Sequence, residues 1–396
     1  MAPAADRKSV GEKSPAPRGF ALFALGFRPF YLLAGALGAV SIPVWAAQFI
    51  GYGPAALDGP MWHAHEMLFG YTFAVITGFL LTAVRNWTQQ PTPVGARLAI
   101  LACLWLAGRV LALSPWPEWS ALTDTVFTLS VAIGIARPLV ASGNRRNYFF
   151  IALVLALGAA NLAFVAALQG VAPFSPGSAV ALGLDIVLFI MAVMAGRVVP
   201  MFTNNAIQGA GARRLPALER VALVLVLLLI ASDLAGQPAP AAAIAGVAAI
   251  AHGARLVLWN PVATRLNPLL WILHASYAWI VVHLALRAAA GLDWVAPDLA
   301  THALTIGAIG GLTLGMMTRS ARGHTARPLV AGYAETGCFW LVQLAAAARV
   351  LLPIAVPAVY VTGVVLSGLL WSAAFVLFTF EYWPMLTRPR LDGQPG

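Results

Sequence analysis

About twelve apolar stretches, each long enough to cross a bilayer as an α-helix, follow one another along this 396-residue chain. A span needs about 20 mostly apolar residues, because each helical residue adds about 1.5 Å and the hydrocarbon core is about 30 Å thick. Only 10% of the residues are charged and 60% are hydrophobic, whereas soluble domains carry about 25% charged residues. The sequence therefore excludes a soluble core and predicts an all-α integral membrane protein, a bundle of about twelve transmembrane helices.

The predicted spans form one transmembrane domain, 26–384, between an N-terminal tail, 1–25, and a C-terminal tail, 385–396. The spans are expected at 29–50, 63–84, 97–115, 120–141, 148–169, 178–199, 217–235, 239–259, 268–289, 299–318, 331–352 and 357–380. The seventh and eighth spans are the weakest, because only a Gly-Gln-Pro turn separates them.

The distribution of basic residues predicts how the bundle is oriented. If the N-terminus is cytoplasmic, all of the 24 lysines and arginines except Arg109, Arg287 and Arg349 fall on the cytoplasmic side. Such an excess follows the positive-inside rule, so we expect both termini in the cytoplasm and the bundle in an inner or plasma membrane. The net charge of +10 comes from basic residues in short turns, and such turns do not form a nucleic-acid-binding face.

The two cysteines, Cys103 and Cys338, lie far apart, each inside an apolar run. They are typical of small core residues, so neither a disulfide framework nor a thiolate-bound iron–sulfur or zinc site is indicated. The first 18 residues are polar and lack the short apolar core and cleavage site of a signal peptide. We expect this segment to be a cytoplasmic tail.

Seven histidines stand out in this apolar background: His63, His65, His252, His274, His283, His302 and His324. An ionisable side chain is costly to insert into a membrane and therefore marks a candidate functional site. Imidazole is also the usual protein ligand of haem iron and copper. The predicted topology sorts the histidines into an outer group and an inner group. The outer group is His63, His65 and His302, and the inner group is His274 and His324, with His252 a further candidate.

The spacing of His63 and His65 constrains the outer group. Residues two apart on a regular helix point about 200° from each other, so these two imidazoles cannot bind one metal from a continuous helix. Either they serve different partners, or Pro60 places His63 on an extended segment before the first turn. An aromatic and polar belt at the headgroups is the alternative to metal binding here. For His252 and His283, hydrogen bonding between helices is the more common role.

Several charged residues within the spans also have two interpretations. Glu66, Asp185 and Glu335 are candidates for a proton path or for ion pairs. Glu66 also lies beside His65 and is suited to orient an imidazole. Arg197 either anchors its span at the inner surface or pairs with a porphyrin propionate, since its planar fork suits carboxylates. Arg109 and Arg349 either neutralise the buried acids or extend to the interface.

A glycine-rich run at 305–317 follows His302 within a predicted span. Small residues three and four apart on a membrane helix permit close approach. The approaching object is expected to be another helix, with a flat macrocycle as the alternative.

The sequence resembles the NnrS family of bacterial polytopic membrane proteins, which is associated with the response to nitric oxide. The resemblance rests on motifs that occur in the same order over residues 26 to 330. These are GFRPF at 26–30, WHAHEMLFG at 62–70, TGFLLTAV at 77–84, NWT at 86–88, GRVVP at 196–200, HALTIG at 302–307 and GHT at 323–325. Beyond residue 331 the chain reads as generic apolar spans. The resemblance implies a twelve-span protein of the bacterial inner membrane that contains haem and copper and protects against nitrosative stress.

Within that resemblance, the metal-binding residues are His63, His65, His302 and His324, with His274 as a fifth. We expect haem b between the outer ends of the second and tenth spans, with His65 and His302 as first-choice axial ligands. His63 is then a copper ligand or an alternate axial ligand. The chain has no Cys-x-x-Cys-His motif, so the haem is not expected to be covalently attached.

Two further groups of residues complete the expected sites. Tyr71 or Glu66 is expected to supply hydrogen bonds or protons to the outer site. His274 and His324, together with Arg197, form a second metal or propionate site at the inner end.

Three classes of function agree with these expectations. The first is an enzyme of the nitric oxide reductase type, which needs an electron donor and a proton route through Glu66, Asp185 and Glu335. The second is a protein that binds nitric oxide without turnover. The third is a transporter of metal, haem or a nitrosyl-iron species that uses the histidines along a pathway.

Overall fold

The computed structural model describes residues 19–52 and 59–394. Within those ranges the chain is helical and contains no β-strand, which confirms the all-α class. Most of the predicted N-terminal tail, 1–25, lies outside the described residues. The last helix ends at Thr387, three residues beyond the predicted end of the transmembrane domain.

The long helices follow one another in chain order, and several are extended by π or 3₁₀ turns. They are α1 (Phe27–Phe49), α2 (Gly59–His65) with the π segment η1 (Glu66–Thr72) and α3 (Phe73–Thr88), α4 (Ala96–Leu111), α5 (Pro117–Ala141), η2 (Arg145–Asn147) with α6 (Phe149–Leu168), α7 (Pro176–Ala206), α8 (Pro216–Leu234), α9 (Pro238–Leu258), η3 (Pro261–Thr264), α10 (Pro268–Ala290), α11 (Pro297–His302) with the π segment η4 (Ala303–Gly310) and α12 (Gly311–His324), α13 (Tyr333–Ala355), and η5 (Pro357–Val359) with α14 (Tyr360–Thr387). Prolines open many of these helices, where their missing N–H costs no helical hydrogen bond.

The described residues include ten helical segments that are long and apolar enough to cross a membrane. With α4 and α8, which do not meet that description, the described residues contain twelve long helical segments. Helix α4 is short at 16 residues. Helix α8 has 19 residues, but Glu219, Arg220 and Asp233 interrupt its apolar character.

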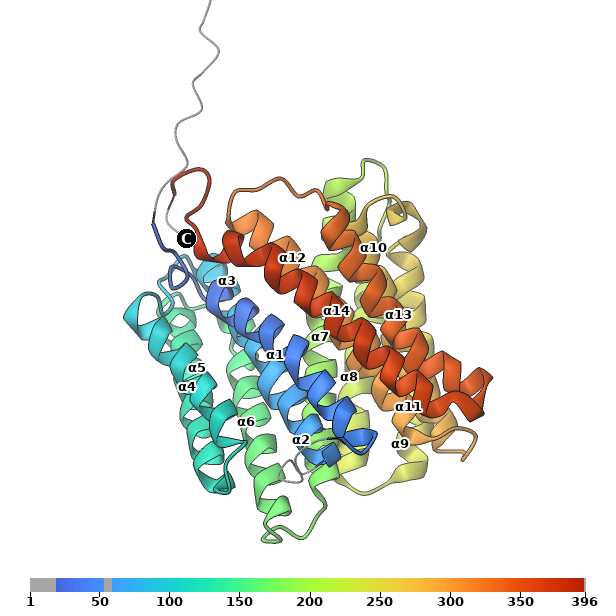
Figure 1. Ribbon diagram of the computed structural model, residues 1–396. Helices are drawn as coiled ribbons and strands as arrows, with labels where there is room; N and C mark the ends of the chain where they lie inside the picture. Colours follow the sequence, from blue (N-terminus) through green and yellow to red (C-terminus); the bar gives the residue numbers. More distant parts are fainter. Residues whose placement is uncertain (1–18, 53–58, 395–396) are drawn as a thin grey trace, which may run out of the picture.

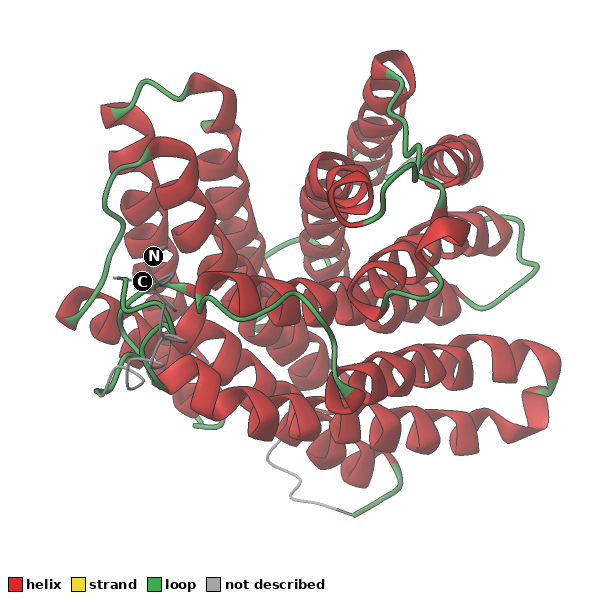
Figure 2. Ribbon diagram, turned by 90° about the horizontal axis from the view of Figure 1, so that it is seen from above, coloured by secondary structure: helices red, strands yellow, loops and turns green. Residues whose placement is uncertain are grey.

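Helices α1, α13 and α14 pack side by side and run diagonally across the front of the bundle (Figure 1). The successive helices α4, α5 and α6 pack together in one part of the molecule, and α8, α9 and α10 pack together in another. Figure 2 shows the described residues from above as helices joined by loops, without strands. Helix α7 contacts both parts, through α6 and α2 on one side and α8 and α10 on the other.

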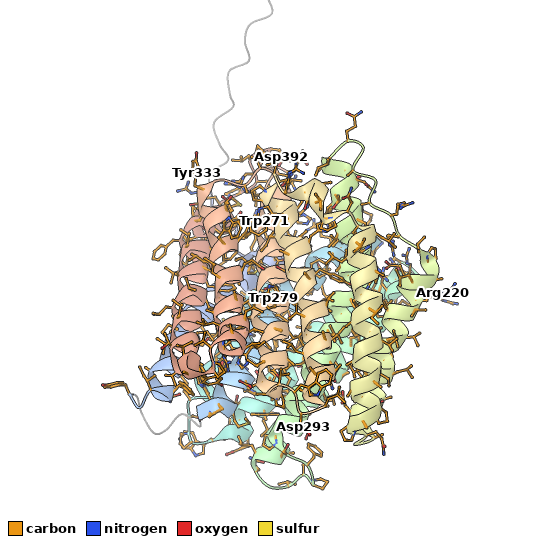
Figure 3. All side chains as sticks on the ribbon, turned by 90° about the vertical axis from the view of Figure 1, so that its right-hand side faces the viewer. Arg220, Trp271, Trp279, Asp293, Tyr333 and Asp392 are labelled. Carbon is orange, nitrogen blue, oxygen red and sulfur yellow. The ribbon has the colours of Figure 1, made fainter. Side chains whose placement is uncertain are left out.

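Both described ends of the chain lie at the same end of the bundle, as an even number of spans requires. The N–H of Ala21 donates to the carbonyl of Thr387 at 2.7 Å, and the Arg28 guanidinium donates to the carbonyls of Leu386 and Arg388 at 3.0 and 2.8 Å. These bonds satisfy carbonyls at the C-terminus of α14. We call this the basic end. Figure 3 shows Tyr333 and Asp392 there, and Asp293 at the opposite end.

The glycine-rich run packs against tryptophans from neighbouring helices. A Cβ atom on Gly307 would lie 2.3 Å from the ring of Trp279, and one on Gly310 would lie 2.3 Å from the ring of Trp371. Trp279 belongs to α10 and Trp371 to α14. Helix packing therefore accounts for the small residues at these two positions, as the sequence analysis expected.

Candidate functional site

A cavity of about 360 Å³ lies near the opposite end of the bundle, between α1, α2, η1, α7, α11, η4, α13 and α14. Its lining is mainly apolar but includes polar side chains that can bind a ligand, among them His63, Tyr71, His302, Arg349 and Tyr360. Small-molecule and cofactor sites usually measure about 300–1,000 Å³ and combine apolar walls with a few polar groups. The cavity therefore has the dimensions and the chemistry of a binding site.

Two π segments shape this cavity. One, η1, begins directly after His65, and the other, η4, begins directly after His302. Met67 and Tyr71 from η1 and Thr305 and Ile309 from η4 line the cavity. A π turn inserts an extra residue into a helix and re-aims the side chains around it, and such turns occur frequently at functional sites.

His302 is held with one ring nitrogen directed away from the backbone. Its Nδ1 lies 2.6 Å from the carbonyl oxygen of Asp298, one turn earlier, and donates to it. The neutral ring then keeps Nε2 as an acceptor, and Nε2 makes no hydrogen bond with the described residues. A backbone carbonyl on one nitrogen is the usual way to fix the tautomer of a metal-binding imidazole.

His63 is positioned by stacking. Its ring lies 4.4 Å from the ring of Trp45 on α1, with an interplanar angle of 23°. Its Nδ1 is buried and has no hydrogen-bond partner among the described residues. Because burying a donor or acceptor without a partner is costly, this imidazole is suited to a ligand that the protein does not itself supply.

Arg349 connects α13 to the helix that carries His302. Its Nη2 donates to the carboxylate of Asp298 at 3.0 Å and lies 3.0 Å from the hydroxyl of Tyr360, which itself donates to Asp298 at 2.9 Å. Its Nη1 is buried without a partner among the described residues. One edge of the guanidinium therefore holds Asp298, and the other is left for an acceptor.

Tyr71 lies at the inner limit of the cavity and bonds to the helix opposite. Its hydroxyl is 2.6 Å from that of Thr313 on α12. Thr313 donates its own proton to the carbonyl of Ile309 at 2.6 Å, so Tyr71 is the donor in this pair.

His65 lies in a separate buried network outside the cavity. Its Nδ1 is 2.9 Å from Glu66 and its Nε2 is 2.9 Å from the Asn161 amide oxygen. Arg109 bridges Glu66 at 2.7 Å and Asp124 at 2.5 Å. Two carboxylates thus face one guanidinium. Both ring nitrogens are used within the protein.

The structure brings His63 and His302 together at the cavity and separates His65 from them. Helix α2 is regular from Gly59 through both histidines, so the alternative with His63 on an extended segment is not adopted. Residues two apart then diverge, as the spacing predicted. The sequence predicted His65 and His302 as two ligands of the same haem. In the structure these two residues lie in different environments.

The other predicted acids also form ion pairs outside the cavity. Asp185 accepts from Arg287 at 2.8 Å, and Arg287 also bonds to Asp233. Glu335 pairs with Arg322 at the basic end and accepts from the N–H of Gly332 at 2.8 Å, which caps helix α13. Neither acid lines the cavity.

The predicted inner group is dispersed in the same way. His274 pairs through Nε2 with the Thr203 hydroxyl at 2.9 Å, and Arg197 donates to the Asn147 side chain at 2.8 Å. The ring of His324 packs at 5.6 Å from that of Phe27. Across the described ranges, no group of three or more His, Cys, Asp or Glu side chains is arranged to hold a metal ion.

The C-terminal segment closes over His324 at the basic end. Arg390 donates to the carbonyl of His324 at 3.2 Å and pairs with Asp392. Hydrogen bonds from Arg390 lower the pKa of the exposed Asp392 carboxyl to about 2, so this pair stays ionised at neutral pH.

His252 and His283 are held by neighbouring groups. His252 pairs through Nδ1 with the Tyr277 hydroxyl at 2.6 Å, and His283 donates through Nδ1 to the carbonyl of Ala300 at 2.8 Å. These contacts join adjacent helices, which is the role that we considered more common for both residues.

Sequence reasoning missed the part that Asp298, Tyr360 and Trp45 play around the cavity. One signal for this arrangement was present: Arg349 is one of three arginines that do not follow the positive-inside pattern. In the structure, all three form buried or half-buried ion pairs with carboxylates. An arginine on the side of the membrane that has few basic residues therefore indicated an acidic partner within the bundle.

Taken together, the fold and the cavity define a polytopic α-helical membrane protein with a histidine-lined cavity near one end of the bundle. The NnrS protein family model matches residues 21–390, which is nearly the whole sequence, and the chain belongs to this family. No curated protein sequence matches the chain. The family match extends beyond residue 331, where the sequence showed only generic spans, and so includes Arg349 and Tyr360 of the cavity.

Proposed function

We propose that this protein binds haem b and copper in the bacterial inner membrane and handles nitric oxide or its metal adducts, as a protection against nitrosative stress. One observation carries the proposal. His63 and His302 line the same cavity, and each has a ring nitrogen without a partner among the described residues. Imidazole is the ligand that both haem iron and copper accept.

The residues of the cavity suit a haem. His302, fixed by the carbonyl of Asp298, would hold the haem iron. Arg349, whose Nη1 has no partner among the described residues, is assigned to a propionate carboxylate. The apolar remainder of the lining suits a porphyrin ring.

When bound, the haem would supply an iron that nitric oxide can ligate. The chain contributes the selectivity of the site. His302 is held firmly by a hydrogen bond, whereas His63 is held only by stacking on Trp45. We therefore assign His63 as the exchangeable ligand, in place of His65, whose ring nitrogens bond to Glu66 and Asn161.

For copper, His63 is the favoured residue of this chain, because copper accepts imidazole readily. Two assignments of His63 follow, as a copper ligand or as the second axial ligand. They predict different metal contents: one copper for each haem in the first case, and a six-coordinate haem without copper at His63 in the second.

The transporter alternative has less support. It requires histidines placed along a pathway, but His252, His274 and His283 do not line the cavity, although each keeps one buried ring nitrogen without a partner among the described residues. A cavity at one end of the bundle favours a binding site. Enzymatic reduction of nitric oxide would additionally need an electron donor and a proton donor, and Glu66 does not line this cavity.

The visible spectrum of the detergent-purified protein tests this proposal, recorded oxidised, reduced with dithionite, and reduced with nitric oxide. We expect a Soret band that shifts with nitric oxide. His302→Ala should lose the haem, and His63→Ala should keep haem but alter its ligation or the copper content. His65→Ala is the matched comparison and should retain the spectrum. The absence of a Soret band in the wild type, or a normal haem spectrum in His302→Ala, would refute the assignment.

A further inference from the structure

A second hollow continues the cavity by one helical turn toward the middle of the bundle. Tyr71 and Ile309 line the cavity, and the residues four positions later on the same two chain segments, Val75 and Thr313, line the second hollow. Helix α7 contributes to both, with Leu184 at the cavity and further residues at the hollow. We call the second hollow the apolar crevice; it is lined by Tyr31, Val75, Ile76, Phe79, Leu80, Ile190, Met191, Met194, Ala195, Val198, Val199, Leu273, Leu312, Thr313 and Met316.

The apolar crevice has no group that would hold water. Its volume is about 90 Å³, roughly three times the volume that a water molecule occupies in the liquid. The two hydroxyls on its wall already have partners: Tyr31 bonds to Ser320, and Thr313 bonds to Tyr71 and Ile309. A buried water needs two to four polar partners, and apolar cavities without them stay dry and take up apolar molecules.

The rim of the apolar crevice is partly exposed and lies on helices long enough to cross a membrane. Phe79, Met191, Met194, Val198 and Met316 are half-buried, and all lie within membrane-length helices. Neutral diatomic gases favour apolar surroundings over water, for the reason that drives other apolar transfers. The bilayer interior is therefore the natural source of such a molecule.

The hydrogen bond from Tyr71 to Thr313 lies between the cavity and the apolar crevice. The Tyr71 ring is buried and packs against Trp371 and Phe375 at 5.7 and 5.2 Å between ring centroids. Opening this bond would join two compartments that already share the same helices.

We propose that the apolar crevice is a binding site for a small neutral apolar molecule, and that it carries such a molecule from the bilayer to the histidine-lined cavity. We identify the occupant of this site as nitric oxide, and this identification rests on the proposed function. The crevice supplies the molecule to the cavity without passing it through water, with the Tyr71–Thr313 bond as the gate.

Two measurements on the full-length protein test this proposal, with xenon as the first probe. Xenon binding, measured by ¹²⁹Xe NMR or in crystals under xenon pressure, does not depend on any cofactor. We expect xenon in the apolar crevice of the wild type and its loss in Val198→Phe, which fills the crevice. Val224→Phe makes the same change at an exposed position on α8 and should leave xenon binding unchanged. Ala195→Val is a smaller filling change for use if Val198→Phe fails to fold.

The second measurement is the rebinding of nitric oxide to the reduced holoprotein after flash photolysis. Val198→Phe should slow the rebinding of nitric oxide severalfold with an unchanged Soret band. Tyr71→Phe, which removes the hydrogen bond of the gate, should change the rebinding rate. Val224→Phe should leave the rebinding rate unchanged. Wild-type protein without xenon in the crevice, or Val198→Phe with an unchanged rebinding rate, would overturn the proposal. If the holoprotein does not bind nitric oxide at all, the proposed function fails, and the xenon measurement still decides whether the crevice is a site.

Discussion

At the residue scale, the three arginines outside the positive-inside pattern show how this membrane protein neutralises buried charge. Each pairs with acids from other helices: Arg109 with Glu66 and Asp124, Arg287 with Asp185 and Asp233, and Arg349 with Asp298. All five contacts are ion pairs between side chains. A charge in low dielectric is tolerated only with a partner, so the loss of one member exposes the cost of the other.

Arg109→Ala provides a direct test of this cost. The substitution leaves two buried carboxylates without their guanidinium, and breaking a buried pair typically costs about 3–5 kcal/mol. We expect a loss of that order in the free energy of unfolding, measured by denaturant titration in detergent micelles. Arg220→Ala is the control, since Arg220 is exposed on α8 and surface changes usually stay within about 0.5 kcal/mol. Equal losses in the two variants would show that the network does not contribute as proposed.

Arg349→Gln tests the assignment of this residue to a cofactor carboxylate. The substitution removes the free Nη1 edge and the bond to Asp298, so we expect a lower haem content after purification and faster haem loss. Tyr360→Phe removes one hydrogen bond to the same carboxylate but keeps the guanidinium, and it should retain most of the haem. Haem content is measured from the pyridine haemochrome spectrum per mole of protein. Loss of haem in Tyr360→Phe but not in Arg349→Gln would contradict the assignment.

At the element scale, the length and order of the spans were predictable, but the side chains that face the cavity were not. Apolar content marks where the hydrocarbon core lies, so the predicted span 178–199 falls inside the longer helix Pro176–Ala206. The π segments have no signature in the apolar pattern. The spacing showed that His63 and His65 diverge, but which of them faces His302 depends on the rotation of α2 about its axis. That rotation is set by packing against α1 and α7.

Gly310→Ala tests whether η4 must approach α14 as closely as it does. The added Cβ would lie 2.3 Å from Trp371, and overpacking of this kind typically costs about 1–3 kcal/mol. Gly253→Ala is the matched control, because its nearest side-chain atom is 3.7 Å away and alanine in a helix is favoured over glycine by about 1 kcal/mol. We expect opposite signs for the two changes in thermal stability. A stabilising effect of Gly310→Ala would mean that the close packing is not needed.

At the scale of the whole molecule, the two ends of the described chain lie at the basic end of the bundle, while the cavity lies near the other end. From the rule that relates basic turns to the cytoplasm, we expect the cavity to lie toward the external face. The described contacts establish that the ends meet, through Ala21 with Thr387 and Leu391 with Thr325, and the direction follows from the charge distribution.

Cysteine labelling in spheroplasts tests that direction. In a background where both native cysteines are replaced by alanine, Asp293→Cys and Asp392→Cys introduce single thiols at opposite ends of the bundle (Figure 3). A membrane-impermeant maleimide should label the thiol at position 293 in spheroplasts, and the thiol at position 392 only after the membrane is opened. The reverse pattern would invert the protein and place the histidine-lined cavity toward the cytoplasm. Labelling of both thiols from outside would contradict a bundle with its two ends on opposite sides of the membrane.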